Sequence, residues 1–213
     1  MYIIINKGVV ELKKKKNKIL NIIANILLVF SLVFTACLLY RNIVYGGVYI
    51  DGSSMEPTLH SHEYGYKNKT SAARKSALKK RFKIVILKLH DDVENKEKII
   101  VKRVIGLPNE TIRIDSASGN LYVNEELVGQ PFVSQEVRAL TCQSSRGVAC
   151  DNDFVVPNNS IYVLGDNRGV SLDSERRYGA IPYENIDGVL RVIFKKCSEF
   201  KQSTCSYISP RWY

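Results

Sequence analysis

The sequence predicts a mainly β domain, a folded-over antiparallel sheet of barrel-like form, behind one N-terminal transmembrane helix. Three observations predict it. Residues 19–40 form an uncharged apolar stretch, short β-branched and aromatic runs follow residue 41, and turn residues separate those runs. With 213 residues and no apparent internal repeat, the chain is long enough for one domain with a sizeable core.

The N-terminal apolar stretch is long enough to cross a bilayer. Residues 19–40 are rich in Leu, Ile, Val and Phe, and as a helix they would span about 33 Å. A cleavable signal peptide has the same outline of positive charge followed by an apolar run. This run exceeds the usual 7–15 residues or so of such a region, and no small-x-small site precedes Tyr40 and Arg41. An uncleaved anchor is therefore favoured.

Charge is distributed unevenly along the chain. The formal net charge is +10, and residues 1–41 hold seven Lys or Arg and one Glu. The lysines at 13–18 directly precede the apolar stretch, which predicts that the N-terminus stays in the cytoplasm. We expect a cytoplasmic basic tail at 1–18, a single transmembrane anchor at 19–40 in a bacterial plasma membrane, and an extracytoplasmic domain at 41–213. Since the lysine run adjoins a membrane span, nucleic acid is not an expected partner.

After the anchor, the pattern is that of short strands. One more segment, 66–81, is polar and basic without apolar periodicity, so we expect a mobile loop or a frayed helix there, close to lipid headgroups. The runs 111–114 and 121–123 flank turn residues and predict a hairpin. The expected strands are 46–50, 82–89, 98–105, 111–114, 121–123, 154–156, 161–164 and 188–194.

Four of the five cysteines form two evenly spaced pairs. Cys142 with Cys150, and Cys197 with Cys205, each enclose seven residues, whereas Cys37 lies in the apolar stretch. Outside a bacterial membrane, two local disulfides are favoured, each stabilising the fold by about 2–3 kcal/mol. A four-cysteine zinc site is the alternative, although such sites prefer C-x2-C spacing.

Three segments carry residues suited to nucleophilic catalysis. They read DGSSMEPT at 51–58, VKRVIGLPNE at 101–110 and GDNRGVSLDSERRYG at 165–179. A serine hydroxyl needs a neighbouring base, and Lys102 follows three apolar residues that would bury it. Burial would lower its pKa from about 10.4 to about 7–8, which suits a general base. Arg103 stays protonated and cannot serve. The chemistry alone does not choose between Ser53 and Ser54.

Together, in order and spacing, the three segments resemble the type I signal peptidases, membrane-bound serine endopeptidases of the S26 family that use a Ser-Lys dyad. The resemblance implies that Ser54 is the nucleophile and Lys102 the general base. Gly52 stands where many Gram-negative relatives have Ser or Thr, so the chain is similar to the Gram-positive form and its second oxyanion donor stays open. Asn109 replaces the usual glycine after Leu-Pro, and Phe82-Lys83 replaces a common Gly-Asp.

The third segment supplies the supporting residues that the resemblance implies. Ser171 would hydrogen-bond the lysine ammonium, Asp173 and Arg176 would form an ion pair, and Asp166 and Asn167 would shape the turn. Compared with the family pattern, Glu175 is an extra residue. Choosing Arg176 rather than Arg177 for the ion pair therefore depends on how this insertion is aligned.

The resemblance also implies a substrate and partners. The family removes signal peptides from exported preproteins after small-x-small sites, and Val48, Ile50, Met55 and Val101 are our candidates for the walls of its pocket, although each fits plain core equally well. The lipid bilayer and the secretion translocon are the other expected partners. We expect no cofactor and no metal, since His60, His62 and His90 lack a convincing third ligand.

The sequence also leaves other functions open. A non-catalytic relative could act as a factor in surface pilus assembly, but such relatives tend to lack the Ser-Lys pair. A dedicated, non-housekeeping peptidase with few substrates is a variant of the main interpretation. A self-cleaving repressor-type Ser-Lys protein would need a DNA-binding domain, and the sequence shows none.

Overall fold

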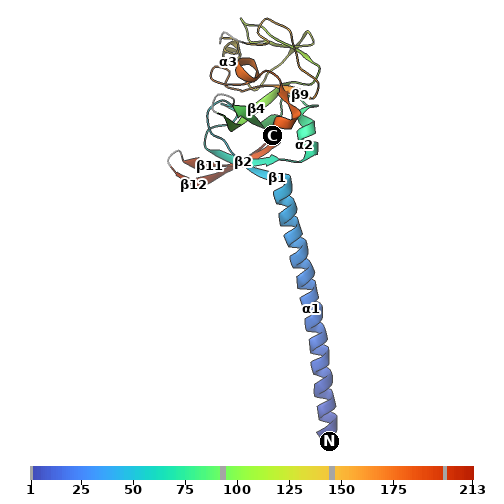
Figure 1. Ribbon diagram of the computed structural model, residues 1–213. Coiled ribbons are helices and arrows are strands. Elements are labelled where there is room, and N and C mark those ends of the chain that lie inside the picture. Colours follow the sequence, from blue (N-terminus) through green and yellow to red (C-terminus); the bar gives the residue numbers. More distant parts are fainter. Residues whose placement is uncertain (1, 92–94, 144–146, 199–200) are drawn as a thin grey trace. The chain divides into compact units, whose positions relative to one another are not determined.

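The computed structural model describes residues 2–91, 95–143, 147–198 and 201–213. The chain divides into two compact units, residues 1–43 and 44–213. The first is helical and the second is built mainly from antiparallel strands (Figure 1). The expectation of a mainly β domain that follows one N-terminal apolar helix is confirmed.

One continuous helix, α1 (Tyr2–Val44), makes up the N-terminal unit. It is longer than the expected anchor because Glu11, Leu12 and the lysines at 13–16 and 18 are good helix formers, so the helix extends ahead of the apolar stretch. Lys16–Val44 is long and apolar enough to cross a membrane by length and composition. Its large apolar side chains, such as Phe30, are exposed, as expected for a helix that is apolar on all sides.

The larger sheet of the second unit has eight strands, and every pairing within it is antiparallel. Its longest strand pairs with three others along its length, and register shifts at Ile186/Gly188, Leu190/Val192 and Ile193/Lys195 interrupt those ladders. Such irregularities bend a strand, so one strand can serve both parts of a folded-over sheet. In spatial order the strands are β1 (Tyr45–Tyr49), β2 (Glu63–Asn68), β11 (Ile186–Ser198), β3 (Ile84–Asp91), β4 (Lys96–Gly106), β9 (Ser160–Leu164) and β10 (Ile181–Pro182), and β12 (Lys201–Trp212) pairs with β11.

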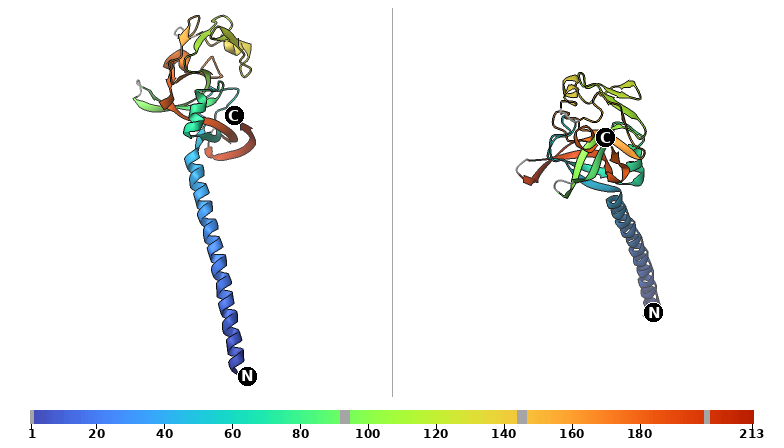
Figure 2. Two further views of the ribbon diagram at one scale, coloured as in Figure 1. Left: turned by 90° about the vertical axis from the view of Figure 1, so that its right-hand side faces the viewer. Right: turned by 45° about the horizontal axis from the view of Figure 1, so that its top comes forward.

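A smaller, four-stranded sheet contains the expected hairpin. Ile112 lies opposite Val123 and Ile114 opposite Leu121, and all four side chains are buried. This sheet lies at the far end of the domain from β1 in the views of Figures 1 and 2. Its strands are β7 (Glu126–Val128), β6 (Leu121–Val123), β5 (Thr111–Ile114) and β8 (Phe154–Val155).

Short helical elements lie between the strands. Thr70 caps the first and Ser134 the second, each through a side-chain oxygen that accepts a backbone N–H, whereas Asp173 caps a single π-helical turn. These elements are α2 (Ser71–Ala77), α3 (Gln135–Ala139), η1 (Ser174–Tyr178) and η2 (Tyr183–Asn185).

Two sequence expectations need correction. Of the two forms expected for 66–81, the helix is found at 71–77, but it is capped and its Ala77 is buried, and residues 66–68 belong to β2, so a mobile loop is not. The strands β2 and β12 were not predicted. Neither shows an apolar alternation, because the buried positions of β2 are Glu63, Gly65 and Lys67, and residues 205–212 of β12 are half-buried or exposed.

Candidate active site

The turn that carries Ser54 is fixed at both ends. Ile50 donates its N–H to the carbonyl of Glu63 and accepts the N–H of His62, both at 2.8 Å, which closes the loop that follows β1. Inside this loop Met55 and Leu59 are buried in one apolar cluster with Val48 and Ile50. Buried side chains on either side of it therefore hold Ser54, which stays partly exposed, in place.

Lys102 reaches this turn from β4. Its Nζ lies 2.7 Å from Ser54 Oγ, and the side chain is only 3% exposed. The backbone of Lys102 is registered opposite Val85 of β3, so its position is set by the sheet. The pKa of Lys102 is lowered to about 8, mainly by burial; the carboxylates of Asp173 and Asp166 oppose this shift, and the charge of Lys98 adds to it.

The side chains of Ser53 and Ser54 have different environments in the structure. Lys102 contacts the hydroxyl of Ser54, whereas the side chain of Ser53 is exposed and its carbonyl accepts a 3.2 Å hydrogen bond from Asn167 Nδ2. The N–H of Asn167 donates to the carbonyl of Ser54 at 3.1 Å. Asn167 therefore binds the backbone on both sides of the 53–54 peptide.

Gly165 allows this close approach. A Cβ at this position would lie 2.2 Å from Ser171 Oγ and 2.4 Å from the Ser54 carbonyl oxygen. No side chain other than glycine's hydrogen fits between them, so the segment that begins at residue 165 packs directly against the Ser54 backbone.

A buried ion pair also links this segment to the strand of Lys102. Arg103 donates from Nε and Nη2 to the two carboxylate oxygens of Asp166, at 2.8 and 2.5 Å. The hydroxyl of Thr58, at the end of the Ser54 loop, donates to Asp166 Oδ2 at 2.5 Å. Sequence reasoning considered Arg103 only as a base and missed this role; the signal that was available is strand alternation, which places it on the opposite face from Lys102.

Arg168 is a second residue that sequence reasoning missed. It is 2% exposed, and its guanidinium donates to the carbonyl of Gly165 at 2.9 Å, to Thr141 Oγ1 at 3.1 Å and to the side-chain oxygen of Gln130. Burial lowers its pKa to about 10, and the carboxylates of Asp166 and Asp173 oppose that shift. At neutral pH it is a buried cation that braces the turn.

The expected ion pair between Asp173 and Arg176 is wrong. Asp173 accepts the N–H groups of Gly165 at 3.0 Å and of Glu175 at 3.2 Å. Arg176 donates instead to three backbone carbonyls, those of Gly169, Ser171 and Leu140. Because Asp173 caps η1, its two oxygens are already occupied by backbone donors.

Ser171 differs from expectation as well. Its Oγ is fully buried and has no hydrogen-bond partner in the described part of the chain, so the expected bond to the Lys102 ammonium is not formed. Ser171 still lies beside the Ser54 backbone, because both border the space above Gly165.

A cavity of about 540 Å³ opens beside Ser54 and Lys102. All four expected wall residues line it, namely Val48, Ile50, Met55 and Val101. Its volume is in the range of ligand pockets, about 300–1,000 Å³. The histidines stay outside it: His62 Nδ1 lies 2.6 Å from the hydroxyl of Tyr49, and His60 lies 3.7 Å from Glu56.

The cysteines are joined as two local disulfides, Cys142 to Cys150 and Cys197 to Cys205. The second crosslinks directly opposed residues of β11 and β12. Cys37 is free and exposed on α1. The four paired sulfur atoms thus offer no thiolate for the zinc site considered above.

The fold and this site define a class of protein. The family model of signal peptidase, peptidase S26, matches residues 21–195, and the chain belongs to that family. Signal peptidase I U from Bacillus subtilis (strain 168) is 31% identical over 203 residues, which cover 93% of this chain and 99% of that protein. Signal peptidase I from Bacillus amyloliquefaciens is 32% identical over 168 residues, 78% of this chain and 84% of that protein. The chain is a type I signal peptidase of Gram-positive-like form.

Among solved structures, a signal peptidase I from Enterococcus faecalis V583 is 27% identical and covers 52% of this chain and 95% of its own, with a TM-score of 0.38. The curated relatives are signal peptidases, so the alternative of a pilus assembly factor gains no support from them.

Proposed function

We propose that this chain removes signal peptides from exported preproteins with Ser54 as nucleophile and Lys102 as general base. The observation that carries the proposal is the 2.7 Å contact between Lys102 Nζ and Ser54 Oγ, made by a lysine that is 3% exposed. A pKa near 8 leaves a useful fraction of neutral amine at physiological pH, which can accept the hydroxyl proton.

The reaction then follows acyl transfer. Ser54 Oγ attacks the scissile carbonyl carbon while Lys102 takes its proton, and the resulting ammonium protonates the leaving amine as the peptide bond breaks. Neutral Lys102 next removes a proton from water, which attacks the acyl-enzyme ester; as the ester bond breaks, the Lys102 ammonium returns a proton to Ser54 Oγ and the signal peptide leaves with a free carboxylate. The N–H of Ser54 is our candidate for one oxyanion donor, and Gly52 offers no hydroxyl for a second.

The other residues position this pair. Asn167 holds the 53–54 backbone, Asp166 joins the Ser54 loop to the strand of Lys102, and Asp173 orients the turn through the N–H of Gly165. Ser171, whose buried hydroxyl has no partner among the described residues, would accept or donate a hydrogen bond if the Lys102 amine rotates during catalysis. Arg176 orders the turn through backbone carbonyls.

Substrate selection is assigned to the cavity beside Ser54. Val48, Ile50, Met55 and Val101 give it apolar walls, which favour small side chains before the scissile bond by excluding larger ones. We therefore propose cleavage after small-x-small sites.

Helix α1 is proposed as the membrane anchor. Lys16–Val44 has the length and composition to span a bilayer, and the lysines that precede residue 19 favour a cytoplasmic N-terminus. The domain at 44–213 would then lie outside the membrane, near lipid headgroups and the secretion translocon, where preproteins emerge. Protease digestion of intact protoplasts and of inverted vesicles tests this orientation: the domain should be cut only in protoplasts.

Cleavage of a synthetic preprotein in detergent tests the chemistry. We expect wild type and Ser53→Ala to cut after the small-x-small site, and Ser54→Ala and Lys102→Ala to lose activity by at least about 10³-fold. Replacing the residue before the scissile bond by Phe should abolish cleavage. Equal activity in Ser54→Ala and wild type would refute the assignment.

A further inference from the structure

Three consecutive residues at the start of η1 bind two different parts of the domain. Asp173 accepts the N–H of Gly165 at 3.0 Å, and Ser174 Oγ accepts the N–H of Val163 at 2.9 Å, so both contact the end of β9. The third residue, Glu175, reaches away from these two. It is the residue that interrupts the family pattern.

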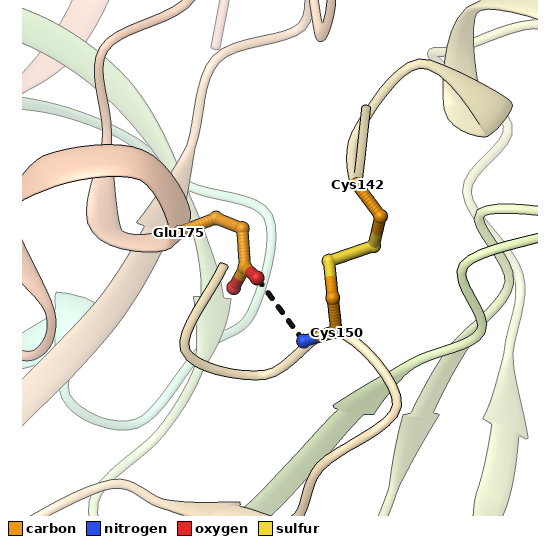
Figure 3. Close-up of side chains that lie close together, drawn as sticks. All are labelled: Cys142, Cys150 and Glu175. Carbon is orange, nitrogen blue, oxygen red and sulfur yellow. Dashed lines mark hydrogen bonds between the residues drawn. A yellow bond between two sulfur atoms is a disulfide. The ribbon is translucent and has the colours of Figure 1, made fainter. Parts of the chain in front are cut away.

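The carboxylate of Glu175 is buried and fully occupied. It is 1% exposed, accepts the N–H groups of Ala149 at 3.0 Å and Cys150 at 3.1 Å, and accepts the hydroxyl of Tyr162. Figure 3 shows the carboxylate pointing at the backbone of Cys150, with the bond to Cys142 beside it. Burial raises its pKa, and the hydrogen bonds from Tyr162, Ala149 and Cys150 limit the rise.

The residues just before Cys142, at the other end of the disulfide, contact the segment that carries Glu175. Thr141, next to Cys142, accepts Arg168 Nη1 at 3.1 Å, and the carbonyl of Leu140 accepts Arg176 Nη2 at 3.0 Å. Both ends of the 142–150 loop are thus bound to residues 165–176, the segment that lies against the Ser54 backbone.

Residues 147–150 fit closely around the carboxylate. A Cβ on Gly147 would lie 1.9 Å from Glu175 Oε1 and 2.9 Å from Cys150 Sγ. The disulfide ties Cys150, whose N–H is one of the donors, to Cys142, and a buried carboxylate that loses a donor is left partly unsatisfied.

We propose that Glu175 and the Cys142–Cys150 disulfide form a brace that positions residues 165–171, and through them Ser54 and Lys102, for peptide cleavage. The inference rests on the proposed function. Glu175 is a positioning residue, because it contacts neither Ser54 nor Lys102 and does not line the cavity. Opening the disulfide frees the 142–150 loop, Glu175 loses its amide donors, and the turn behind Ser54 loosens.

Reduction of the full-length protein in detergent tests the brace. Dithiothreitol gives two electrons and two protons to the disulfide, which becomes two thiols, and closes into its own cyclic disulfide. Alkylation and mass spectrometry then report which pair has opened. We expect kcat to fall by about tenfold or more as Cys142–Cys150 opens, with KM changed by less than about twofold, because positioning affects the reacting atoms.

Two matched cysteine variants separate the two disulfides. Cys142→Ser with Cys150→Ser should start at the reduced kcat and lose nothing more to dithiothreitol. Cys197→Ser with Cys205→Ser should keep the wild-type kcat while oxidised and lose it on reduction. Wild-type kcat in the first variant, or loss that follows the second disulfide, would overturn the proposal.

Variants of Glu175 distinguish its proposed positioning role from an effect of its charge on Lys102. Glu175→Ala should lower kcat as reduction does. Glu175→Gln keeps an oxygen for the two amides and an NH2 group for the Tyr162 oxygen, so it should retain kcat within about threefold and keep the pH profile of wild type. A shifted profile in Glu175→Gln would show that the charge acts on Lys102, and the positioning role would be wrong.

Hydrogen exchange gives a readout that needs no substrate. Amides at 147–150 and 163–175 should exchange faster in Glu175→Ala and in the reduced protein, while those of the β1–β2 pair should not. Unchanged exchange would overturn the brace. A wild type that cuts no preprotein but shows these changes would instead refute the proposed function alone.

Discussion

Arg103 and Asp166 are joined by two parallel hydrogen bonds across 63 residues of sequence, and both side chains are at least nine-tenths buried. Arg103 follows Lys102 on β4, and Asp166 precedes Asn167, which holds the Ser54 backbone. The pair therefore connects the two halves of the proposed dyad through rigid backbone. The pair also holds Arg103, the neighbour of Lys102, and Asp166, the neighbour of Asn167, in fixed positions.

Breaking this ion pair should destabilise the protein. Arg103→Met leaves the Asp166 carboxylate buried without its cation, and we expect the free energy of unfolding to fall by about 3–5 kcal/mol. Arg103→Lys keeps the charge but loses the two-pronged contact, so its loss should be smaller. The exposed pair of Arg113 with Asp153 is the control, since Arg113→Met should cost no more than about 1 kcal/mol. Denaturant unfolding measures all three, and equal losses for Arg103→Met and Arg113→Met would contradict the prediction.

The pH dependence of cleavage should report Lys102. Because the neutral amine is the base, kcat/KM should rise with pH through about 8, the pKa that burial sets. Lys98 lowers that pKa by charge repulsion, so Lys98→Gln should move the rise to higher pH. Initial rates between about pH 6 and 10 measure both curves, on an N-acetylated preprotein that has no His, Cys or Tyr near the cleavage site, so that the substrate does not titrate there. A rise centred near pH 6.5 or so would point to a histidine instead.

Replacing Lys102 by an apolar residue should abolish activity and make the folded protein more stable. Its pKa is lowered on folding, from 10.5 to about 8, so at pH 7 the folded protein holds a buried ammonium that destabilises it. Lys102→Met should be inactive yet unfold at higher temperature than wild type at pH 7. Between pH 8 and 10.5 the unfolded state binds more protons than the folded state, so wild-type stability rises with pH and the difference should shrink. A constant difference over this window would show that charge is not its cause.

Gly165 offers a steric test of the turn behind Ser54. In Gly165→Ala the new methyl group would overlap Ser171 Oγ and the Ser54 carbonyl, and displacing that backbone should lower kcat by about 10²-fold or more. Gly129→Ala is the matched control, because a Cβ there meets nothing within 4 Å. Preprotein cleavage by the two variants, at equal folded content by circular dichroism, gives the comparison. Activity in Gly165→Ala equal to that in Gly129→Ala would mean that the turn does not set the position of Ser54.

The proposed dyad was predicted from local sequence pattern. Ser54 and Lys102 lie in short segments whose order resembles one family, and the apolar run before residue 41 identifies a helix without reference to any contact. Most inner strands could be predicted from the sequence, because their buried positions are apolar residues that alternate or form a continuous run. The strands β2 and β12 were missed because the buried positions of β2 are Glu63, Gly65 and Lys67 and because residues 205–212 of β12 are not buried, so neither strand has an apolar pattern.

The contacts of the residues that support the site could not be predicted from local sequence patterns. A pattern that pairs Asp173 with Arg176 cannot foresee that backbone N–H groups occupy the carboxylate, because this depends on how residues 165–175 fold back on themselves. The insertion of Glu175 looked like a disturbance of the motif, whereas its carboxylate binds a loop 25 residues away.

By itself, the sequence determined which residues could react, where an apolar helix lies and which cysteines are spaced to pair, since each depends on residue type and short-range spacing. Only the tertiary structure decided what holds them in place: that Arg103 binds Asp166, that Asp173 binds Gly165, and that Glu175 binds the disulfide loop. Such contacts join residues brought together by sheet register and strand order. A polar side chain that is buried takes whichever donor the fold places beside it.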